Sequence, residues 1–414
     1  MPEPPAASSS RLTRQRSFVL FWCARTFSNG GFMMQGVAVG WQIYELTGDP
    51  MDLGLVGLAQ FFPVVVLSVV IGQIADRFDR RAVAAFCQAA KALAALALAL
   101  GSARGWLTRD SMLAIVFFSG TARAFEMPTM HALLPATIPT ILLPRAIAAS
   151  ASAQQTAVIC GPSIGGLLYG LGPTAVYVTC AVVFIAACLL IGRVRIAPPA
   201  AGRKPLSMET LFAGFAYIYS RPILLGAISL DLFAVLLGGV TALLPIYARD
   251  ILHAGPWALG LLRSAPALGA LAASIALARH AFSGRAGPIM FAAVGTFGAA
   301  SVLFALSTSI TMSLIALAIY GASDAVSVVI RQSLVQMRTP YDMLGRVLAV
   351  NSMFTGSSGS LGEFRAGAIA AWLGAVPSAL IGGFGAVAVM LIWLAAFPQL
   401  RRVDRLTPEG GPAR

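Results

Sequence analysis

Long apolar stretches, each of a length that can cross a membrane as a helix, recur along almost the whole chain. About 20 apolar residues in a helix span the hydrocarbon core, which offers no water to an exposed backbone. The sequence therefore predicts an all-α membrane protein with 12 transmembrane helices. The stretches cover residues 17–45, 51–75, 82–103, 110–138, 144–171, 174–194, 222–248, 257–279, 287–307, 310–337, 344–373 and 376–398.

The overall composition agrees with this class. Hydrophobic residues make up 58% of the chain and charged residues only 11%, whereas roughly 25% of a soluble domain is charged. A soluble fold would have too few polar residues to cover its surface.

The basic residues fall almost entirely on every second loop. By the positive-inside rule these loops and both termini are predicted to be cytoplasmic. The excess of 29 basic over 16 acidic residues then reports topology, and no nucleic-acid partner is expected. The predicted cytoplasmic set is Arg11, Arg14, Arg16, Arg77, Arg80, Arg81, Arg145, Arg193, Arg195, Arg203, Lys204, Arg221, Arg279, Arg285, Arg338, Arg346, Arg401, Arg402, Arg405 and Arg414.

The stretches divide into two sets of six, and a faint internal repeat relates the sets. Pro139, Leu143 and Arg145 recur 201 residues later, in the corresponding loop of the second set. Such duplicated halves are typical of secondary transporters. The predicted parts are an N-terminal tail (1–16), a six-helix bundle (17–195), a linker with an amphipathic helix near 206–219 (196–221), a second six-helix bundle (222–398) and a C-terminal tail (399–414).

The loop between the second and third stretches has a distinctive sequence, Gly-Gln-Ile-Ala-Asp-Arg-Phe-Asp-Arg-Arg, at residues 72–81. It resembles the cytoplasmic signature loop of the major facilitator superfamily, with Asp79 where that pattern has a second glycine. The resemblance implies two pseudo-repeat bundles and a gate in which Asp76 meets backbone amides or an arginine. An alternative is that the arginines only set topology. The gate candidates are Gly72, Asp76, Arg77, Arg80 and Arg81.

A second motif lies in the fifth stretch, where Gly161, Pro162, Gly165 and Gly166 occur in the order Gly-Pro-Ser-Ile-Gly-Gly. It resembles the element found in exporter branches of the superfamily. Small residues allow helices to pack backbone to backbone, and a proline permits a bend. Tight packing without any meaning for transport direction is the alternative.

Much of the second half resembles one branch of the superfamily, which includes the bacterial enterobactin exporter. The likeness covers residues 205–222, 230–252, 255–266 and 345–364. It implies proton-linked efflux of siderophores or other amphipathic small molecules.

Charged residues inside the stretches are the candidates for coupling and for lining a cavity. Each costs on the order of 2.5–3.5 kcal/mol at the bilayer centre, so it must be paired, reach water or serve a function. In the fold that the resemblance implies, the first, fourth, seventh and tenth helices line the central cavity. The candidates are Arg25, Arg123, Glu126, Asp231, Asp324 and Glu363.

The spacing of these charges suggests partners for some of them. Arg123 and Glu126 are three residues apart, so they share a helix face and can form a static or a proton-exchanging pair. Asp231 and Asp324 have no obvious local partner, apart from Arg331 two turns below Asp324, and are the favoured proton carriers. Structural pairing with Arg25 or Arg123 across the cavity is the alternative. Lys91 is expected to extend toward the inner membrane surface.

The predicted function is a monomeric, proton-coupled antiporter that exports a small organic molecule by alternating access. Lipid, the small molecule and protons are the expected partners. A nutrient importer, or less favourably a non-transporting sensor or scaffold, is the alternative. The sequence contains no phosphate-binding loop, catalytic triad or metal cluster of the kind that an ATP-driven pump or an enzyme needs. No enzymatic activity, cofactor or metal is therefore expected.

Overall fold

The computed structural model describes residues 12–67, 78–195, 208–279 and 284–403, with side chains from 213 onward in the third range. Within these ranges the chain is helical and contains no strand. It divides into two compact units, Met1–Ala38 with Phe62–Pro205 and Val39–Phe61 with Leu206–Arg414. This division places residues 39–61 with the second unit, and the boundaries of the two six-helix bundles stay a prediction.

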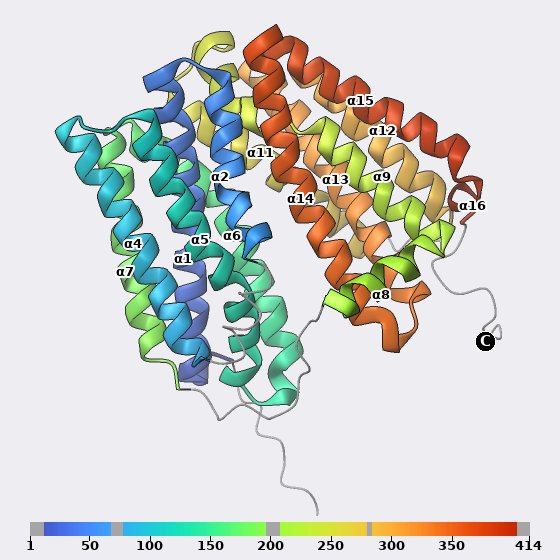
Figure 1. The fold of residues 1–414 in the computed structure, drawn as a ribbon, viewed down its shortest axis with the longest axis horizontal. Helices are drawn as coiled ribbons and strands as arrows, with labels where there is room; N and C mark the ends of the chain where they lie inside the picture. Colours follow the sequence, from blue (N-terminus) through green and yellow to red (C-terminus); the bar gives the residue numbers. More distant parts are fainter. Residues whose placement is uncertain (1–11, 68–77, 196–207, 280–283, 404–414) are drawn as a thin grey trace, which may run out of the picture. The chain divides into compact units, whose positions relative to one another are not determined.

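The first unit contains most of the N-terminal helices (Figure 1). Two helices, α1 and α2, contribute to both units. The bounds are η1 (Leu12–Arg14), α1 (Arg16–Thr47), α2 (Pro50–Val66), α4 (Arg80–Arg104), α5 (Arg109–Leu133), η2 (Leu134–Thr137), η3 (Thr140–Leu142), α6 (Leu143–Tyr169) and α7 (Pro173–Gly192).

Local sequence signals explain several of these helix ends. Asp79 caps α4 by accepting a hydrogen bond from the Arg81 amide, and Gly105 ends α4 with a φ of 70°, which favours glycine. Thr108 and Ser111 form a reciprocal capping box at the start of α5. These signals separate α4 from α5 by a short turn, so the two helices run in opposite directions and pack together.

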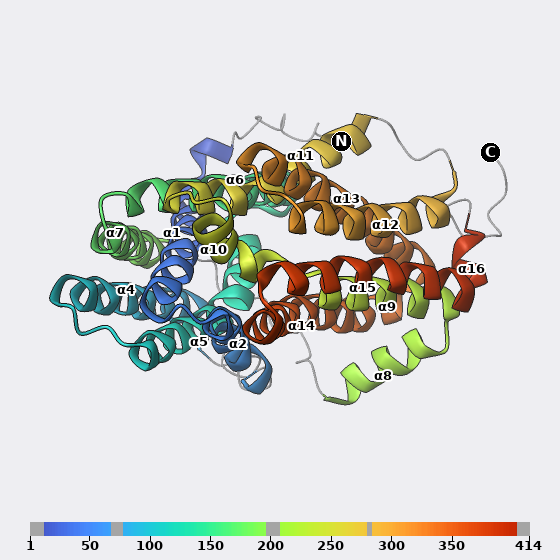
Figure 2. The same ribbon diagram turned by 90° about the horizontal axis from the view of Figure 1, so that it is seen from above.

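The second unit contains α8 (Met208–Tyr219), α9 (Pro222–Gly238), η4 (Thr241–Leu243), α10 (Leu244–Ile246), η5 (Tyr247–Ile251), α11 (Pro256–Arg279), α12 (Ala286–Ala305), α13 (Ile310–Arg338), α14 (Tyr341–Leu373), α15 (Ala375–Ala396) and α16 (Pro398–Arg401). Figure 2 shows its long helices in two rows, with α11, α13 and α12 in one and α14, α9 and α15 in the other. The rows meet where α12 packs on α15.

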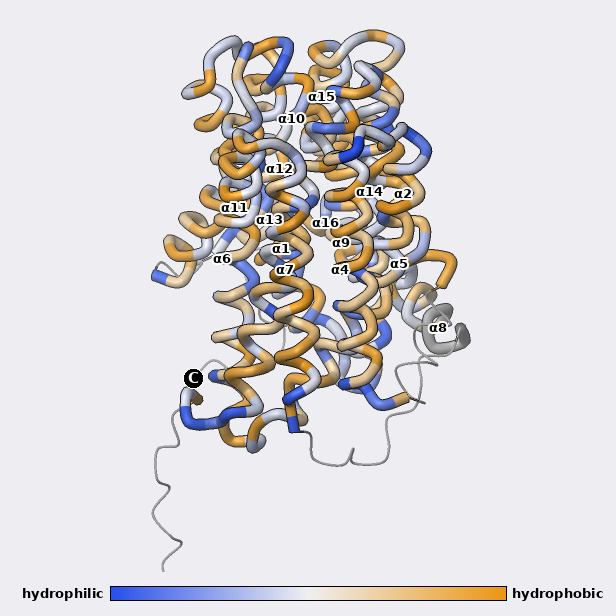
Figure 3. Tube along the Cα trace, turned by 90° about the vertical axis from the view of Figure 1, so that its left-hand side faces the viewer, coloured by the Kyte–Doolittle hydropathy of each residue, from blue (hydrophilic) through white to orange (hydrophobic). Residues whose placement is uncertain are grey.

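Seven of the described helices or helix groups are long and apolar enough to cross a membrane. Helices α5 and α6, with η2 and η3, pass the same test only as a pair bent by 118°. In Figure 3 hydrophobic residues colour the helices along much of their length, while many hydrophilic residues lie at helix ends and connections. The all-α membrane class is thus confirmed, and the count of twelve spans stays a prediction.

The seventh predicted span is less regular than the sequence indicated. A continuous helix was expected over 222–248, but α9 ends at Gly238 and the chain continues through η4, α10 and the π turn η5. Together Pro222–Ile251 still forms one candidate span. Proline at position 245 removes a backbone donor, which is consistent with the irregular path.

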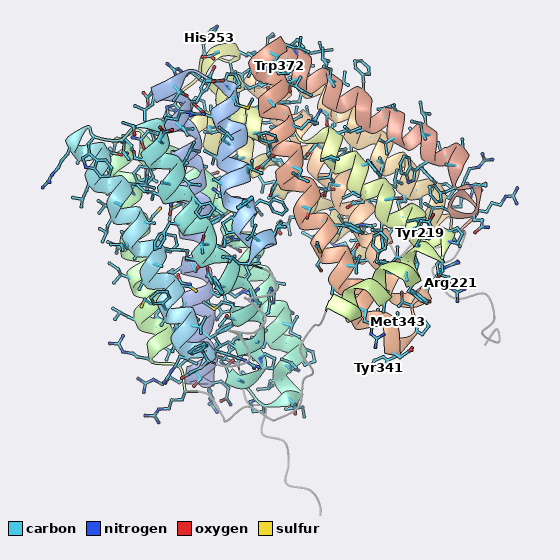
Figure 4. The ribbon with its side chains drawn as sticks, viewed as in Figure 1. Tyr219, Arg221, His253, Tyr341, Met343 and Trp372 are labelled. Atoms are coloured by element: carbon cyan, nitrogen blue, oxygen red, sulfur yellow. The ribbon has the colours of Figure 1, made fainter. Side chains whose placement is uncertain are left out.

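The predicted linker helix is present as α8 and packs against α14 within the second unit. A Cβ at Gly214 would lie 2.8 Å from the Arg346 carbonyl oxygen, and Ile218 is buried against Val347 and Val350. Figure 4 places Tyr219, Arg221, Tyr341 and Met343 at this end of the unit and Trp372 and His253 at the other end. Aromatic residues near both ends of the helices fit two membrane–water interfaces.

Close backbone contacts join several helices of the second unit, and α11 and α13 provide a test. A Cβ at Gly269 would overlap the carbonyl oxygen of Ala318. We expect Gly269→Ala to lower the apparent melting temperature of the purified protein, because such overpacking costs about 1–3 kcal/mol. Gly359→Ala is the matched control, since a Cβ there meets nothing within 4 Å. Equal melting temperatures for the two variants would contradict this packing.

Candidate functional site

The signature loop lies largely outside the described residues. Gly72, Asp76 and Arg77 fall in the undescribed range 68–77, so their gating role stays a prediction. Arg80 is the first residue of α4, and Arg81 follows it. The Arg81 guanidinium lies 3.6 Å from the Asp79 carboxylate and donates a hydrogen bond of 3.4 Å to the Val194 carbonyl.

Glu126 on α5 is the centre of a buried polar cluster in the first unit. The Lys91 ammonium on α4 lies 2.5 Å from one carboxylate oxygen. The other oxygen accepts hydrogen bonds from the Ser28 hydroxyl on α1 and from the Gln88 amide, the latter at 2.7 Å. The carboxylate is therefore held by three donors from two neighbouring helices.

Lys91 does not extend to the membrane surface, and that expectation was wrong. Its side chain has 0% exposure, and its ammonium lies 4.7 Å from the centre of the Phe184 ring while donating to Ser28 at 2.5 Å. The Glu126 carboxylate and the Ser28 hydroxyl satisfy the buried ammonium, so it does not have to reach water. The sequence did not indicate Gln88 or Ser28 as members of the site, and it indicated a position at the membrane surface for the Lys91 ammonium.

Arg123 has a different environment from the one predicted. Its guanidinium carbon lies 3.8 Å from the centre of the Phe32 ring on α1, a cation–π contact, and one terminal nitrogen is buried. Among the described residues Arg123 makes no ion pair within 4 Å, and the buried nitrogen has no hydrogen-bond partner. The static pair with Glu126 is therefore replaced by the pair of Glu126 with Lys91. Arg25 lies on α1 one turn before Ser28.

In the second unit, Asp231 on α9 forms an ion pair with Arg331 on α13, at 3.0 Å. Both side chains are buried, with 5% and 2% exposure. Arg331 also donates to the Asn351 side chain at 2.7 Å and to Thr355 at 3.1 Å, both on α14. Asp231 is thus paired with Arg331, whereas the sequence suggested Arg331 only as a partner of Asp324. Asn351 and Thr355 were not recognised from the sequence.

Asp324, two turns before Arg331 on α13, borders a small cavity with Asp231. Its other lining residues are Ala234, Val235, Val294, Phe297 and Ser327. The cavity's volume of about 10 Å³ is close to the minimum for one water molecule. No ion pair or hydrogen bond to the Asp324 carboxylate occurs among the described residues. Asp324 therefore differs from Glu126 and Asp231, whose carboxylates are each paired with a cation.

Glu363 on α14 lies in another part of the second unit. It accepts a hydrogen bond of 3.0 Å from Thr241, and a Cβ at Gly57 would lie 2.9 Å from its carboxylate. Arg365, two residues further along α14, donates a hydrogen bond to the Leu237 carbonyl instead, so the two charges have different neighbours. In the same unit the Tyr44 hydroxyl donates to Asp250.

The glycine–proline motif brings α6 against α1 in the first unit. A Cβ at Gly161 would lie 2.6 Å from Met33, and one at Gly165 would lie 2.9 Å from the Met34 backbone. Pro162 is inside α6, and Gly166 is buried. The motif therefore occupies a close helix contact, and its meaning for transport direction stays a prediction.

The described part of the chain contains no group of three or more His, Cys, Asp and Glu side chains arranged to hold a metal ion. What it contains is two buried clusters of paired charges on membrane-spanning helices. Such residues mark substrate and ion pathways in transporters. The fold and the clusters define a helical membrane transporter.

Comparison with known proteins identifies the family. Residues 7–409 match the major facilitator family described as "Transmembrane secretion effector", and the chain belongs to that family. It is 28% identical over 411 residues to the enterobactin exporter EntS of Citrobacter koseri, with 97% of each chain covered. It is 27% identical to EntS of Escherichia coli, covering 97% of this chain and 96% of that protein. The chain is thus a transporter and not an enzyme.

Solved transporters share the fold at low sequence identity. A variant of the nucleoside transporter NupG matches with a TM-score of 0.75 at 14% identity, covering 92% of this chain and all of that chain. A bacterial homologue of the iron transporter ferroportin matches with a TM-score of 0.70 at 16% identity, covering 95% and 100%. The predicted major facilitator fold is confirmed by these likenesses.

Proposed function

We propose that this chain is a proton-coupled exporter of a small organic molecule and works as an antiporter in the bacterial inner membrane. The proposal includes twelve spans in two six-helix bundles, cytoplasmic termini and a monomer that works by alternating access. Export is favoured by the likeness to EntS, which is named as an enterobactin exporter. Enterobactin or a related siderophore is accordingly the first molecule to test.

Proton coupling rests mainly on the contrast between the buried carboxylates. A coupling carboxylate must gain and lose a proton during the transport cycle. Glu126 is held by Lys91, Ser28 and Gln88, and Asp231 is held by Arg331. Asp324 makes no such contact with the described residues and borders a cavity about the size of one water. We propose Asp324 as the proton carrier, with Glu126 and Asp231 in supporting ion pairs.

The roles of the remaining candidates follow from their positions. Glu363 is the next coupling candidate, because it is hydrogen-bonded to Thr241 without an ion pair in the described part of the chain. We propose that Gly72, Asp76, Arg77, Arg80 and Arg81 form the cytoplasmic gate. Arg25 is proposed to line the transport pathway.

Export can be separated from import in living cells. The strain that encodes the protein is compared with a deletion strain, under iron-limited and iron-rich conditions, by untargeted profiling of the medium. We expect at least one organic molecule to be depleted from the medium of the deletion strain and enriched inside the cells. A molecule enriched in the medium and depleted inside would indicate import. As a control for the presence of the protein, the deletion strain is complemented with the Asp324→Asn variant.

A further inference from the structure

Arg123 is a partly buried cation on α5, and one of its terminal nitrogens is fully buried. A guanidinium on a membrane-spanning helix normally pairs with an anion, reaches water or performs a function. Arg123 contacts the Phe32 ring at 3.8 Å, and its buried terminal nitrogen lacks a hydrogen-bond partner in the described part of the chain. The neighbouring anion, Glu126, accepts three hydrogen bonds from other residues, of which one is an ion pair. Glu126 also attracts Arg123 electrostatically, but the buried terminal nitrogen of Arg123 has no acceptor among the described residues, which leaves this donor for another group.

Two further polar atoms that lack a hydrogen-bond partner among the described residues lie about one turn from Arg123, on α1 and α5. The contacts Ser28–Glu126 and Phe32–Arg123 fix an antiparallel register between α1 and α5. Continuing this register by one turn brings Gln35 on α1 to the level of Ser119 on α5. The Gln35 carbonyl oxygen and the Ser119 hydroxyl are buried and have no hydrogen-bond partner among the described residues.

Buried polar atoms are nearly always hydrogen-bonded, so three such atoms at neighbouring positions point to a ligand. A guanidinium can donate to an anionic oxygen, and a serine hydroxyl can supply a second donor. A glutamine oxygen can accept from a hydroxyl group. The Phe32 ring provides a flat apolar wall on which the guanidinium stacks.

We propose that Arg123, Ser119 and Gln35 form a subsite for an organic acid that carries a hydroxyl group on a flat or aromatic framework. The anionic group binds Arg123 and Ser119, and the hydroxyl group donates to Gln35. This subsite deepens the proposed transport function and rests on it, because the acid is part of the transported molecule. All the residues named belong to the first unit.

Binding to the purified full-length protein tests the subsite without any proton gradient. The probes are 3-hydroxybenzoate and its neutral counterpart, 3-hydroxybenzamide, titrated by saturation-transfer NMR. We expect the wild-type protein to bind the acid at least tenfold more tightly than the amide. Arg123→Gln should remove that preference, with acid binding weakened at least tenfold more than amide binding, and Arg123→Lys should retain part of the preference. Arg104→Gln, which removes an exposed charge, is the matched control.

A second variant covers the case in which Arg123→Gln does not fold. Ser119→Ala keeps every charge, and we expect it to weaken acid binding about threefold or more. The proposal is overturned if the wild-type protein binds both probes equally or binds neither. It is also overturned if every folded variant at positions 119 and 123 binds the acid as tightly as the wild-type protein.

The same protein in vesicles separates the subsite from the proposed function. If the acid preference depends on Arg123 but a pH gradient drives no accumulation of any transported molecule, the subsite stands and proton-coupled export is wrong. If a pH gradient drives accumulation but acid and amide bind alike, export stands and the subsite is wrong.

Discussion

Asp324→Asn should abolish pH-gradient-driven accumulation of substrate in inverted membrane vesicles while leaving substrate exchange across the membrane measurable. Asparagine has nearly the size of aspartate but cannot bind and release a proton in the physiological range. The Asp324 carboxylate makes no ion pair with the described residues, so its removal strands no buried cation. We expect accumulation to fall to the level of empty vesicles, with counterflow retained.

The neighbouring carboxylates give the controls for this result. Asp324→Glu keeps a titratable group and should restore part of the accumulation. Asp231→Asn leaves Arg331 buried without its ion-pair partner, so it should lower expression and reduce accumulation and counterflow together. If the Asp324→Asn protein concentrates substrate as well as the wild type, Asp324 is not the obligatory coupling group and Glu363 becomes the next candidate.

Lys91→Met should destabilise the protein by about 3–5 kcal/mol, because it leaves the buried Glu126 carboxylate without its counter-ion. Methionine fills a similar volume, so the effect reports the lost charge more than a cavity. The Ser28 hydroxyl and Gln88 amide still donate to Glu126, but neither supplies a positive charge. The measurement is the apparent melting temperature in detergent, together with the amount of protein in the membrane.

The double variant Lys91→Met with Glu126→Leu provides the sharper comparison. Replacing both members of a buried ion pair by apolar residues is often neutral or stabilising. We therefore expect the double variant to recover most of the melting temperature lost in Lys91→Met and to retain accumulation driven by a pH gradient. A stable double variant that exchanges substrate but no longer concentrates it would assign proton coupling to Glu126, against the role proposed for Asp324.

The sequence predicts the helical framework well because hydrophobic length and turn signals are local properties. The ends of α4 and α5 follow from Asp79, Gly105 and Thr108. The break in the span that begins at Pro222 was not predicted, because a run of apolar residues gives no periodic signal for a π turn or for the end of α9 at Gly238. Here packing against neighbouring helices decides the path of the backbone.

The candidate site was predictable only in its charged residues. Spacing along one helix places Arg123 and Glu126 on the same face, but it carries no information about Lys91, which reaches Glu126 from α4. Likewise Arg331 was considered beside Asp324, two turns away on α13, whereas it pairs with Asp231 on α9. Partners on different helices depend on helix rotation and register. A single sequence does not reveal these quantities.

The most direct test of the central claim uses the purified wild-type protein in proteoliposomes. An imposed pH gradient is combined with a molecule that the medium profiling identifies, or with enterobactin, and the internal concentration is followed with and without a protonophore. Proton-coupled export predicts accumulation above the external concentration on the acidic side of the membrane, and loss of that accumulation when the protonophore is added. Equilibration to equal concentrations regardless of the gradient, or accumulation that survives the protonophore, would contradict the proposed proton coupling.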